Sequence, residues 1–289
     1  MRIAFVHGIN NENNTPQSIE QTWWTALSDS WNALGMAQKP KPTISVAYYG
    51  DILAAGSQGN AVEMGPSPVS TGHAVELLKE YARAGGVTQQ DLNAAADEAG
   101  ISRKAVEQGF PHEGWIIDFA GLLEGILPSK GKFIARLFLR QAVVYINDIA
   151  LAAKIDLKVR SQILDGQPDP TIVVAHSLGT VVAYRVLAAQ AQQSRNVPLF
   201  VTLGSPLSVM IFAPILPPRG SLPKPPIAKW LNGRHQDDFV TLGRAITKAS
   251  IGFGGVVDET KIVNPDDDKH SIVRYLASPQ IARAIHAAL

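Results

Sequence analysis

The sequence predicts an α/β fold in which helices flank a doubly wound, mostly parallel β-sheet. Short runs of β-branched and apolar residues alternate along the chain with segments that have the period of amphipathic helices. The short runs are continuously apolar, as in strands that are buried on both faces of a parallel sheet. With 289 residues, of which 46% are apolar and 18% charged, the chain can bury such a core.

The predicted strands and helices follow each other in alternation. Four runs are expected to be strands: Arg2–Val6, Thr43–Tyr48, Thr171–Ala175 and Leu199–Leu203. Three segments are expected to be helices: Thr15–Leu34, Lys130–Leu164 and Leu178–Ser194. The whole chain, 1–289, is expected to form one domain, with a helical insertion or cap over 52–129. A proline-rich stretch, Pro214–Pro226, is expected to be an ordered surface loop.

The charge balance and the missing residue types exclude several classes of protein. Lys and Arg number 26 against 25 Asp and Glu, so no basic excess is available for phosphates and we expect no nucleic-acid partner. The absence of cysteine excludes disulfides, thiol catalysis and cysteine-ligated metal. No His-Glu-x-x-His motif occurs, and Gly252–Gly255 lacks the Lys that a phosphate-binding loop needs. We therefore expect no metal and no cofactor.

Targeting signals are also missing from the sequence. The opening MRIAFVHGIN has only a short apolar run, too short for the core of a signal peptide. The longest apolar candidate for a membrane span, Phe133–Ala153, is interrupted by Arg136, Arg140 and Asp148. We expect a soluble, cytoplasmic protein with no signal peptide and no transmembrane segment.

The segment that predicts chemistry is the junction Thr171–Thr180, with the sequence TIVVAHSLGT. A strand runs into Ala-His-Ser-Leu-Gly, and a helix follows at once. Such a corner lifts Ser177 out of the sheet, and the small residues Ala175 and Gly179 relieve crowding around it. The helix N-terminus offers backbone N–H groups to a developing oxyanion. The alternative is that Ser177 is only the N-cap of the helix.

This junction resembles the nucleophile elbow of the α/β-hydrolase superfamily, especially of its lipase- and esterase-like branches. The resemblance rests on His176-Ser177-Leu178-Gly179, with Ala175 where the pattern usually has glycine. It implies that Ser177 is the nucleophile of a triad in the chain order serine, acid, histidine. It also implies an α/β-hydrolase fold trimmed at its N-terminus, with roughly six strands.

A second part of the resemblance lies at the end of the first strand. That superfamily carries a His-Gly after an early strand, and Val6-His7-Gly8-Ile9 is similar to it. The resemblance implies that the backbone N–H of Ile9 or Gly8, together with that of Leu178, forms an oxyanion hole. For His7 we expect a supporting role, in which its hydrogen bonds orient the loop.

The acid and the base are expected downstream of Ser177. The segment Trp230–Val240 resembles the Trp-x-Asn strand and Asp-Pro-Val loop of lipase-like hydrolases, with Phe in place of Pro. This selects Asp238 as the acid and leaves Asp237 as the alternative. His270 lies in a polar loop before a helical tail and begins a His-Ser-x-x-x-Tyr segment that is common in the family. An imidazole suits the base because it can accept and return a proton near neutral pH.

Together these features predict a serine hydrolase that cleaves carboxylic esters, with a small-molecule or lipid-like ester as substrate. Apolar residues between Trp115 and Leu123 are candidates for a roof over the site, although ordinary helix packing explains them equally well. The same triad would serve an acyltransferase, a thioesterase or a peptidase. A noncatalytic binding module with a hydrolase-like fold is the alternative from another class.

Overall fold

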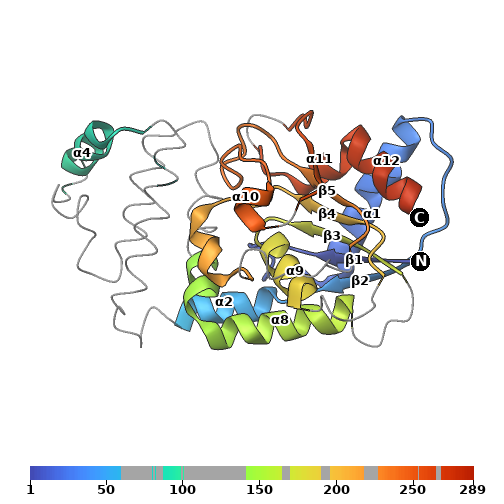
Figure 1. The fold of residues 1–289 in the computed structure, drawn as a ribbon, viewed down its shortest axis with the longest axis horizontal. Coiled ribbons are helices and arrows are strands. Elements are labelled where there is room, and N and C mark those ends of the chain that lie inside the picture. The colour runs from blue at the N-terminus through green and yellow to red at the C-terminus, as the bar shows by residue number, and fades with distance from the viewer. Residues whose placement is uncertain are drawn as a thin grey trace.

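The structure, a computed structural model, contains one six-stranded parallel sheet with the strand order β2-β1-β3-β4-β5-β6 (Figure 1). It describes residues 1–59, 80, 82, 87–98, 100, 141–164, 170–189, 196–217, 227–252, 254–264 and 268–289. All five pairs of neighbouring strands run parallel. The predicted α/β class is confirmed, and the sheet is parallel throughout the described residues.

The four predicted strands are present, with ends within one residue of the prediction. They are β1 (Arg2–Val6), β2 (Thr43–Ala47), β3 (Thr171–His176) and β4 (Phe200–Leu203). The strand expected at Trp230 is β5 (Trp230–Gly233). The sixth strand, β6 (Val256–Glu259), was not predicted, because its four residues lie at the edge of the sheet and none of them is fully buried.

Helices connect most of the strands. They are α1 (Pro16–Ala33), α2 (Gly50–Gly59), α4 (Gln89–Glu98), α8 (Ile149–Ile163), α9 (Leu178–Ala189), α10 (Lys248–Ile251), α11 (Ile272–Ala277) and α12 (Pro279–Ala288), with a 3₁₀ turn at Met210–Ile215. Among the described residues, none of the helices has the length and apolarity that a membrane span requires.

The prediction of a single helix over Lys130–Leu164 is wrong, because the described part of this segment forms two helices. Residues 141–147 are helical, but the helix stops at Asp148 and α8 begins at the next residue. The Asp148 side chain accepts a hydrogen bond from the N–H of Leu151, so it caps α8 instead of continuing the first helix. Residues 130–140 of that prediction, 190–194 of the last helix, 218–226 of the proline-rich loop and most of the 52–129 insertion lie outside the described residues.

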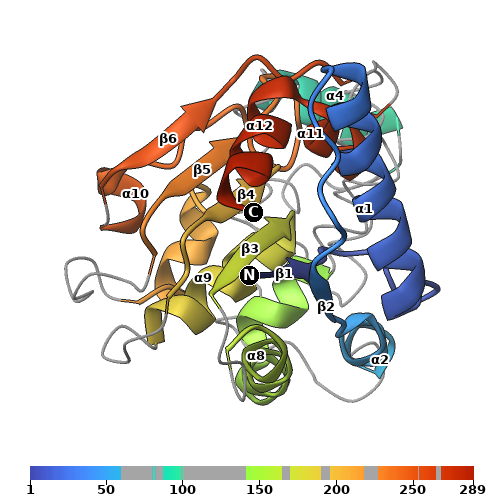
Figure 2. The same ribbon diagram turned by 90° about the vertical axis from the view of Figure 1, so that its right-hand side faces the viewer.

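Two layers of helices enclose the sheet (Figure 2). Ile3 and Phe5 of β1 pack in the hydrophobic cluster that contains α1 and α12. Ala4 and Val6 point to the opposite face, into the cluster that contains α8 and α9. Because successive side chains of a strand alternate between faces, a strand with apolar residues at every position is buried on both sides. This explains the continuous apolar runs in the sequence.

The strand order reverses beside β1. The chain leaves β1 through α1 to reach β2 on one side, whereas β3 lies on the other side of β1 and leads through α9 to β4. The two connecting helices therefore cover opposite faces of the sheet. In open parallel sheets such a reversal leaves a crevice at the carboxyl ends of the two central strands, where ligands bind. Here those ends are His7-Gly8 after β1 and His176-Ser177 in β3 and the turn after it.

The first turn of α9 lies directly against the end of β1. A Cβ atom on Gly179 would be 2.2 Å from the carbonyl oxygen of His7 and 2.5 Å from that of Val6. Backbone atoms of a central strand cannot move aside as the end of a flexible side chain can. Glycine at position 179 therefore sets the distance between α9 and β1.

We predict that Gly179→Ala lowers the free energy of unfolding by about 1–3 kcal/mol, because the added methyl overpacks this contact. The loss should occur although alanine is the better helix former. Gly254→Ala is the matched control, because among the described residues a Cβ there would meet only the side chain of Lys248, at 3.9 Å. Urea denaturation measures both variants, and equal midpoints for the two would contradict the prediction.

Candidate active site

Ser177 occupies the turn between β3 and α9 in a left-handed backbone conformation, with φ of 56°. Non-glycine residues rarely adopt this conformation, which is strained and concentrates at functional sites. The turn is held on both sides, since the Ser177 N–H donates to the Leu203 carbonyl and the Thr180 N–H donates to the Ser177 carbonyl, each at 3.0 Å. These bonds keep the strained turn in place.

The side chain of Ser177 does not behave as a helix cap. An N-cap serine has an extended backbone, and its hydroxyl accepts a hydrogen bond from the first turn of the helix. Ser177 has a positive φ, it is 1% exposed, and its Oγ has no hydrogen-bond partner among the described residues. A buried hydroxyl without a partner is unusual in a folded protein. The geometry therefore favours a chemical role over the N-cap alternative.

The loop after β1 lies against Ser177. A Cβ atom on Gly8 would be 2.4 Å from the Cβ of Ser177 and 3.0 Å from its Oγ. Only glycine fits at this position without displacing the serine. The two predicted segments, His7-Gly8-Ile9 and His176–Gly179, are therefore in direct contact.

Hydrogen bonds fix the peptide planes of this loop. The Gly8 carbonyl accepts from Nδ1 of His7 at 2.7 Å and from Nδ2 of Asn11 at 3.3 Å. Asn11 also donates to the Ile9 carbonyl at 2.7 Å. In a trans peptide the C=O and the following N–H point in opposite directions. A Gly8 carbonyl held by two donors therefore aims the Ile9 N–H the other way.

His7 is a buried, neutral imidazole. Its Nε2 accepts a hydrogen bond from the Tyr49 N–H at 3.1 Å, so the proton resides on Nδ1 and points to Gly8. The Tyr49 hydroxyl in turn donates to the His7 carbonyl. Burial lowers the pKa of His7 from 6.5 to about 4. Its contacts are those of a residue that holds the loop.

Asp238 and His270 form a buried pair. Nδ1 of His270 lies 2.7 Å from Oδ2 of Asp238, and Oδ1 of Asp238 accepts from the Val240 N–H at 2.8 Å. Asp238 is 1% exposed and His270 8% exposed. Asp237, the alternative acid, is exposed to solvent. Of the two neighbouring carboxylates, Asp238 is therefore the one that contacts His270.

His270 packs against His176 and Gly204 at the carboxyl edge of the sheet. Nε2 of His176 bonds the backbone carbonyl of His270 at 3.0 Å, and the two rings lie 4.5 Å apart. A Cβ on Gly204, which follows β4 with φ of 55°, would be 2.7 Å from Cε1 of His270. Burial, followed by the proximity of His270, holds the pKa of His176 well below its usual value. Because His176 precedes Ser177, these contacts bring the serine and His270 to the same edge.

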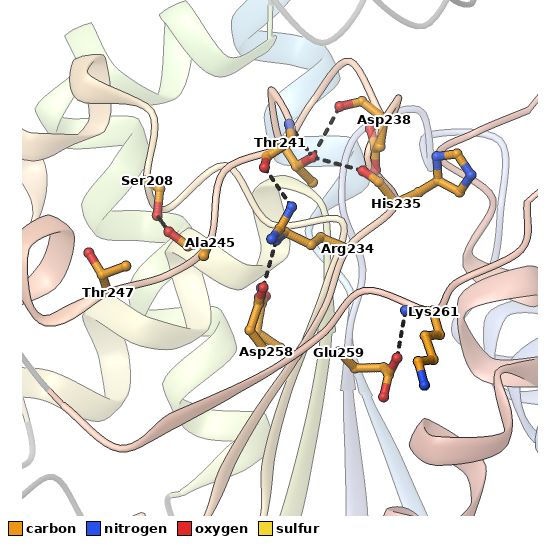
Figure 3. Close-up of polar contacts among 12 residues, drawn as sticks. Ser208, Arg234, His235, Asp238, Thr241, Ala245, Thr247, Asp258, Glu259 and Lys261 are labelled. Atoms are coloured by element: carbon orange, nitrogen blue, oxygen red, sulfur yellow. Dashed lines mark hydrogen bonds and ion pairs between the residues drawn. The ribbon is translucent and has the colours of Figure 1, made fainter.

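The loop that carries Asp238 is anchored to the edge strand β6 (Figure 3). Arg234 donates from Nε to Oδ2 of Asp258 at 2.7 Å and from Nη1 to the Gly243 carbonyl at 2.6 Å. Thr241 donates to the Asp238 carbonyl at 3.0 Å. Figure 3 shows the guanidinium group between Asp258 and this loop. This ion pair was not predicted from the sequence, because the strand that carries Asp258 was not predicted.

All the predicted site residues lie on the carboxyl side of the sheet, and two of their side-chain polar atoms are unpaired. These are Oγ of Ser177 and Nε2 of His270, each buried without a hydrogen-bond partner among the described residues. No group of three or more His, Cys, Asp or Glu side chains that could hold a metal ion occurs in the described part of the chain. No protein-family model matches the chain, and no match was found among curated proteins or solved structures.

The neutral state of His7 predicts a pH-dependent stability. The unfolded chain binds a proton at His7 below about pH 6.5, whereas the folded chain binds it only below about pH 4. Between these values unfolding takes up a proton, so stability falls as the pH is lowered. His7→Gln lacks this titration, so the stability advantage of the parent over the variant should shrink by about 2 kcal/mol between about pH 7.5 and pH 5.

Urea denaturation of both proteins at several pH values measures this difference. The Gln side chain keeps an oxygen that can accept the hydrogen bond from the Tyr49 N–H, so the comparison isolates the titrating group. A difference in unfolding free energy that stays constant with pH would show that His7 is not buried neutral.

Proposed function

We propose that this chain is a serine hydrolase of the α/β-hydrolase kind that cleaves carboxylic esters with Ser177, His270 and Asp238. The observation that carries the proposal is that Oγ of Ser177 and Nε2 of His270 are both buried without a hydrogen-bond partner in the part of the chain that the structure describes. The other ring nitrogen of that histidine is bonded to a buried carboxylate. Acyl transfer requires a nucleophile, a base and a group that orients the base, and the candidates for all three lie at the carboxyl edge of the sheet.

Asp238 has the role of fixing the tautomer of His270. A carboxylate accepts the Nδ1 proton, which leaves Nε2 as the unprotonated nitrogen that can take a proton from the serine. The carboxylate also stabilises the imidazolium that this transfer creates. Its burial strengthens this effect, because a low-dielectric surrounding screens the two charges less than water does.

Two backbone N–H groups are suited to stabilise the oxyanion. Leu178 is the first residue of α9, so its N–H has no acceptor within the helix, and the helix dipole favours negative charge there. Ile9 contributes the second, because the held carbonyl of Gly8 turns the Ile9 N–H away from its own loop contacts. Each such donor is typically worth about 3–4 kcal/mol of transition-state stabilisation.

The proposed reaction has two halves. Oγ of Ser177 forms a bond to the acyl carbon while His270 takes the hydroxyl proton, and the ester C–O bond then breaks as that proton passes to the leaving alcohol. In the second half, water gives a proton to His270 as its oxygen bonds the acyl carbon. The bond between the acyl carbon and Oγ of Ser177 then breaks, the proton passes from His270 back to Oγ, and the acid is released. The apolar segment Trp115–Leu123, which the sequence offered as a roof, lies outside the described residues.

A fluorophosphonate tests the reactivity of Ser177. A fluorophosphonate should add once to the parent protein, with an Oγ–P bond formed, fluoride released and the proton taken by His270. Ser177→Ala should give no adduct. Ser205→Ala is the matched control, because Ser205 is another buried serine at this sheet edge, but its Oγ bonds Thr180 at 2.8 Å.

Intact-mass measurement over time determines the extent and the rate of labelling of the parent and of both variants. The control should be labelled at the parent rate. An unlabelled parent that circular dichroism shows to be folded would count against an activated serine and would favour the binding-module alternative.

Replacing each aspartate with asparagine separates the roles of the two neighbouring carboxylates. With p-nitrophenyl esters of short to long acyl chains, Asp238→Asn should lower kcat by about 10³–10⁴-fold, because the amide no longer fixes the required tautomer. Asp237→Asn should stay within about twofold of the parent, since an exposed side chain away from His270 contributes little. A loss of activity in Asp237→Asn instead would reverse the assignment of the acid.

A further inference from the structure

Tyr275 contacts the proposed acid directly. Its hydroxyl donates to Oδ2 of Asp238 at 2.7 Å, the same oxygen that lies 2.7 Å from Nδ1 of His270. The hydroxyl oxygen also accepts the N–H of His235 at 2.9 Å. Tyr275 is 0% exposed. The two hydrogen bonds that this buried hydroxyl makes with described residues therefore both go to the loop that follows β5.

These two bonds join the segments that carry the acid and the base. Tyr275 belongs to α11, which begins two residues after His270. Asp238 belongs to the loop that follows β5, and the described structure joins that loop to the α11 segment at the Asp238 carboxylate and at the backbone of His235. The hydroxyl thus fixes the loop at two points relative to the helix behind His270.

The hydroxyl of Tyr275 is the donor in its hydrogen bond to Asp238. The His235 N–H can only donate, so of these two partners the carboxylate is the one that accepts the hydroxyl proton. Burial, and after it the charge of Asp238, raises the pKa of Tyr275 well above its usual value. The group therefore stays protonated and acts as a permanent donor.

We propose that Tyr275 is a positioning residue of the catalytic site, which holds the Asp238 carboxylate in the orientation that His270 requires. The inference rests on the proposed serine-hydrolase function. With Val240 N–H on Oδ1 and two donors on Oδ2, the carboxylate has its plane and its rotation fixed. Without the hydroxyl, Oδ2 would lose one donor and the His235 N–H would lose its acceptor. The acid could then rotate away from the imidazole.

The test is the rate of phosphonylation of Ser177 in Tyr275→Phe, which removes only the hydroxyl. The saturating rate constant should fall by about 10- to 100-fold, because a misplaced orienting group costs this much. The fluorophosphonate concentration at half-saturation should not change, because Tyr275 does not contact the probe in this scheme.

Tyr184→Phe is the matched control. Tyr184 is equally buried, and its hydroxyl donates to the Ile251 carbonyl at 3.1 Å, away from the acid loop. This variant should label at the parent rate. Circular dichroism and urea midpoints show whether both variants are folded.

A double-mutant cycle distinguishes positioning from general destabilisation. If Tyr275 acts through Asp238, Tyr275→Phe should change the labelling rate of Asp238→Asn by no more than about twofold. The same loss in both backgrounds, or a Tyr275→Phe protein that labels at the parent rate, would overturn the inference while leaving Ser177 as the nucleophile. A folded parent that does not label would overturn the proposed function itself, and this inference with it.

Discussion

The position of Ser177 depends on how closely the turn after β3 can approach the end of β1. Gly8 on one side and Gly179 on the other allow the approach, because a side chain at either would overlap Ser177 or the backbone of β1. The left-handed backbone of Ser177 costs on the order of 1–3 kcal/mol. The sheet and α9 supply the hydrogen bonds that offset this cost. The proposed nucleophile and the proposed oxyanion donors therefore lie together, at the place where the strand order reverses.

The site residues that the sequence predicts best are those that belong to one continuous segment of the chain. Ser177 and Gly179 belong to a continuous strand–turn–helix signal, so local chemistry alone identifies them. The choice of Asp238 over Asp237 came only from the resemblance of Trp230–Val240 to a family segment, because both residues lie in one loop and the burial that separates them is a tertiary property. In the sequence, Tyr275 appeared only as the last residue of the His-Ser-x-x-x-Tyr segment that begins at His270. Its hydrogen bond to Asp238 depends on how the loop after β5 packs against α11.

The central strands of the fold were predictable from the sequence, whereas the edge strand β6 was not. Central strands must be apolar on both faces, so β1 and β3 are recognisable from composition alone. The edge strand β6 has one neighbour and partial exposure, which removes that signal. The Arg234–Asp258 pair between β5 and β6 is consequently invisible in sequence, although it anchors the loop that carries Asp238.

Burial gives the histidines around Ser177 different electrostatic roles. His7 and His176 both have pKa values lowered by burial, so both are neutral near neutral pH. In the proposed reaction a positive charge forms on His270, whose ring centre lies 4.5 Å from that of His176. A charged His176 at this distance would oppose it by about 4 kcal/mol at an effective dielectric constant of about 20. A neutral His176 can hold the His270 backbone by a hydrogen bond without that penalty, which leaves the Asp238 carboxylate to stabilise the new charge.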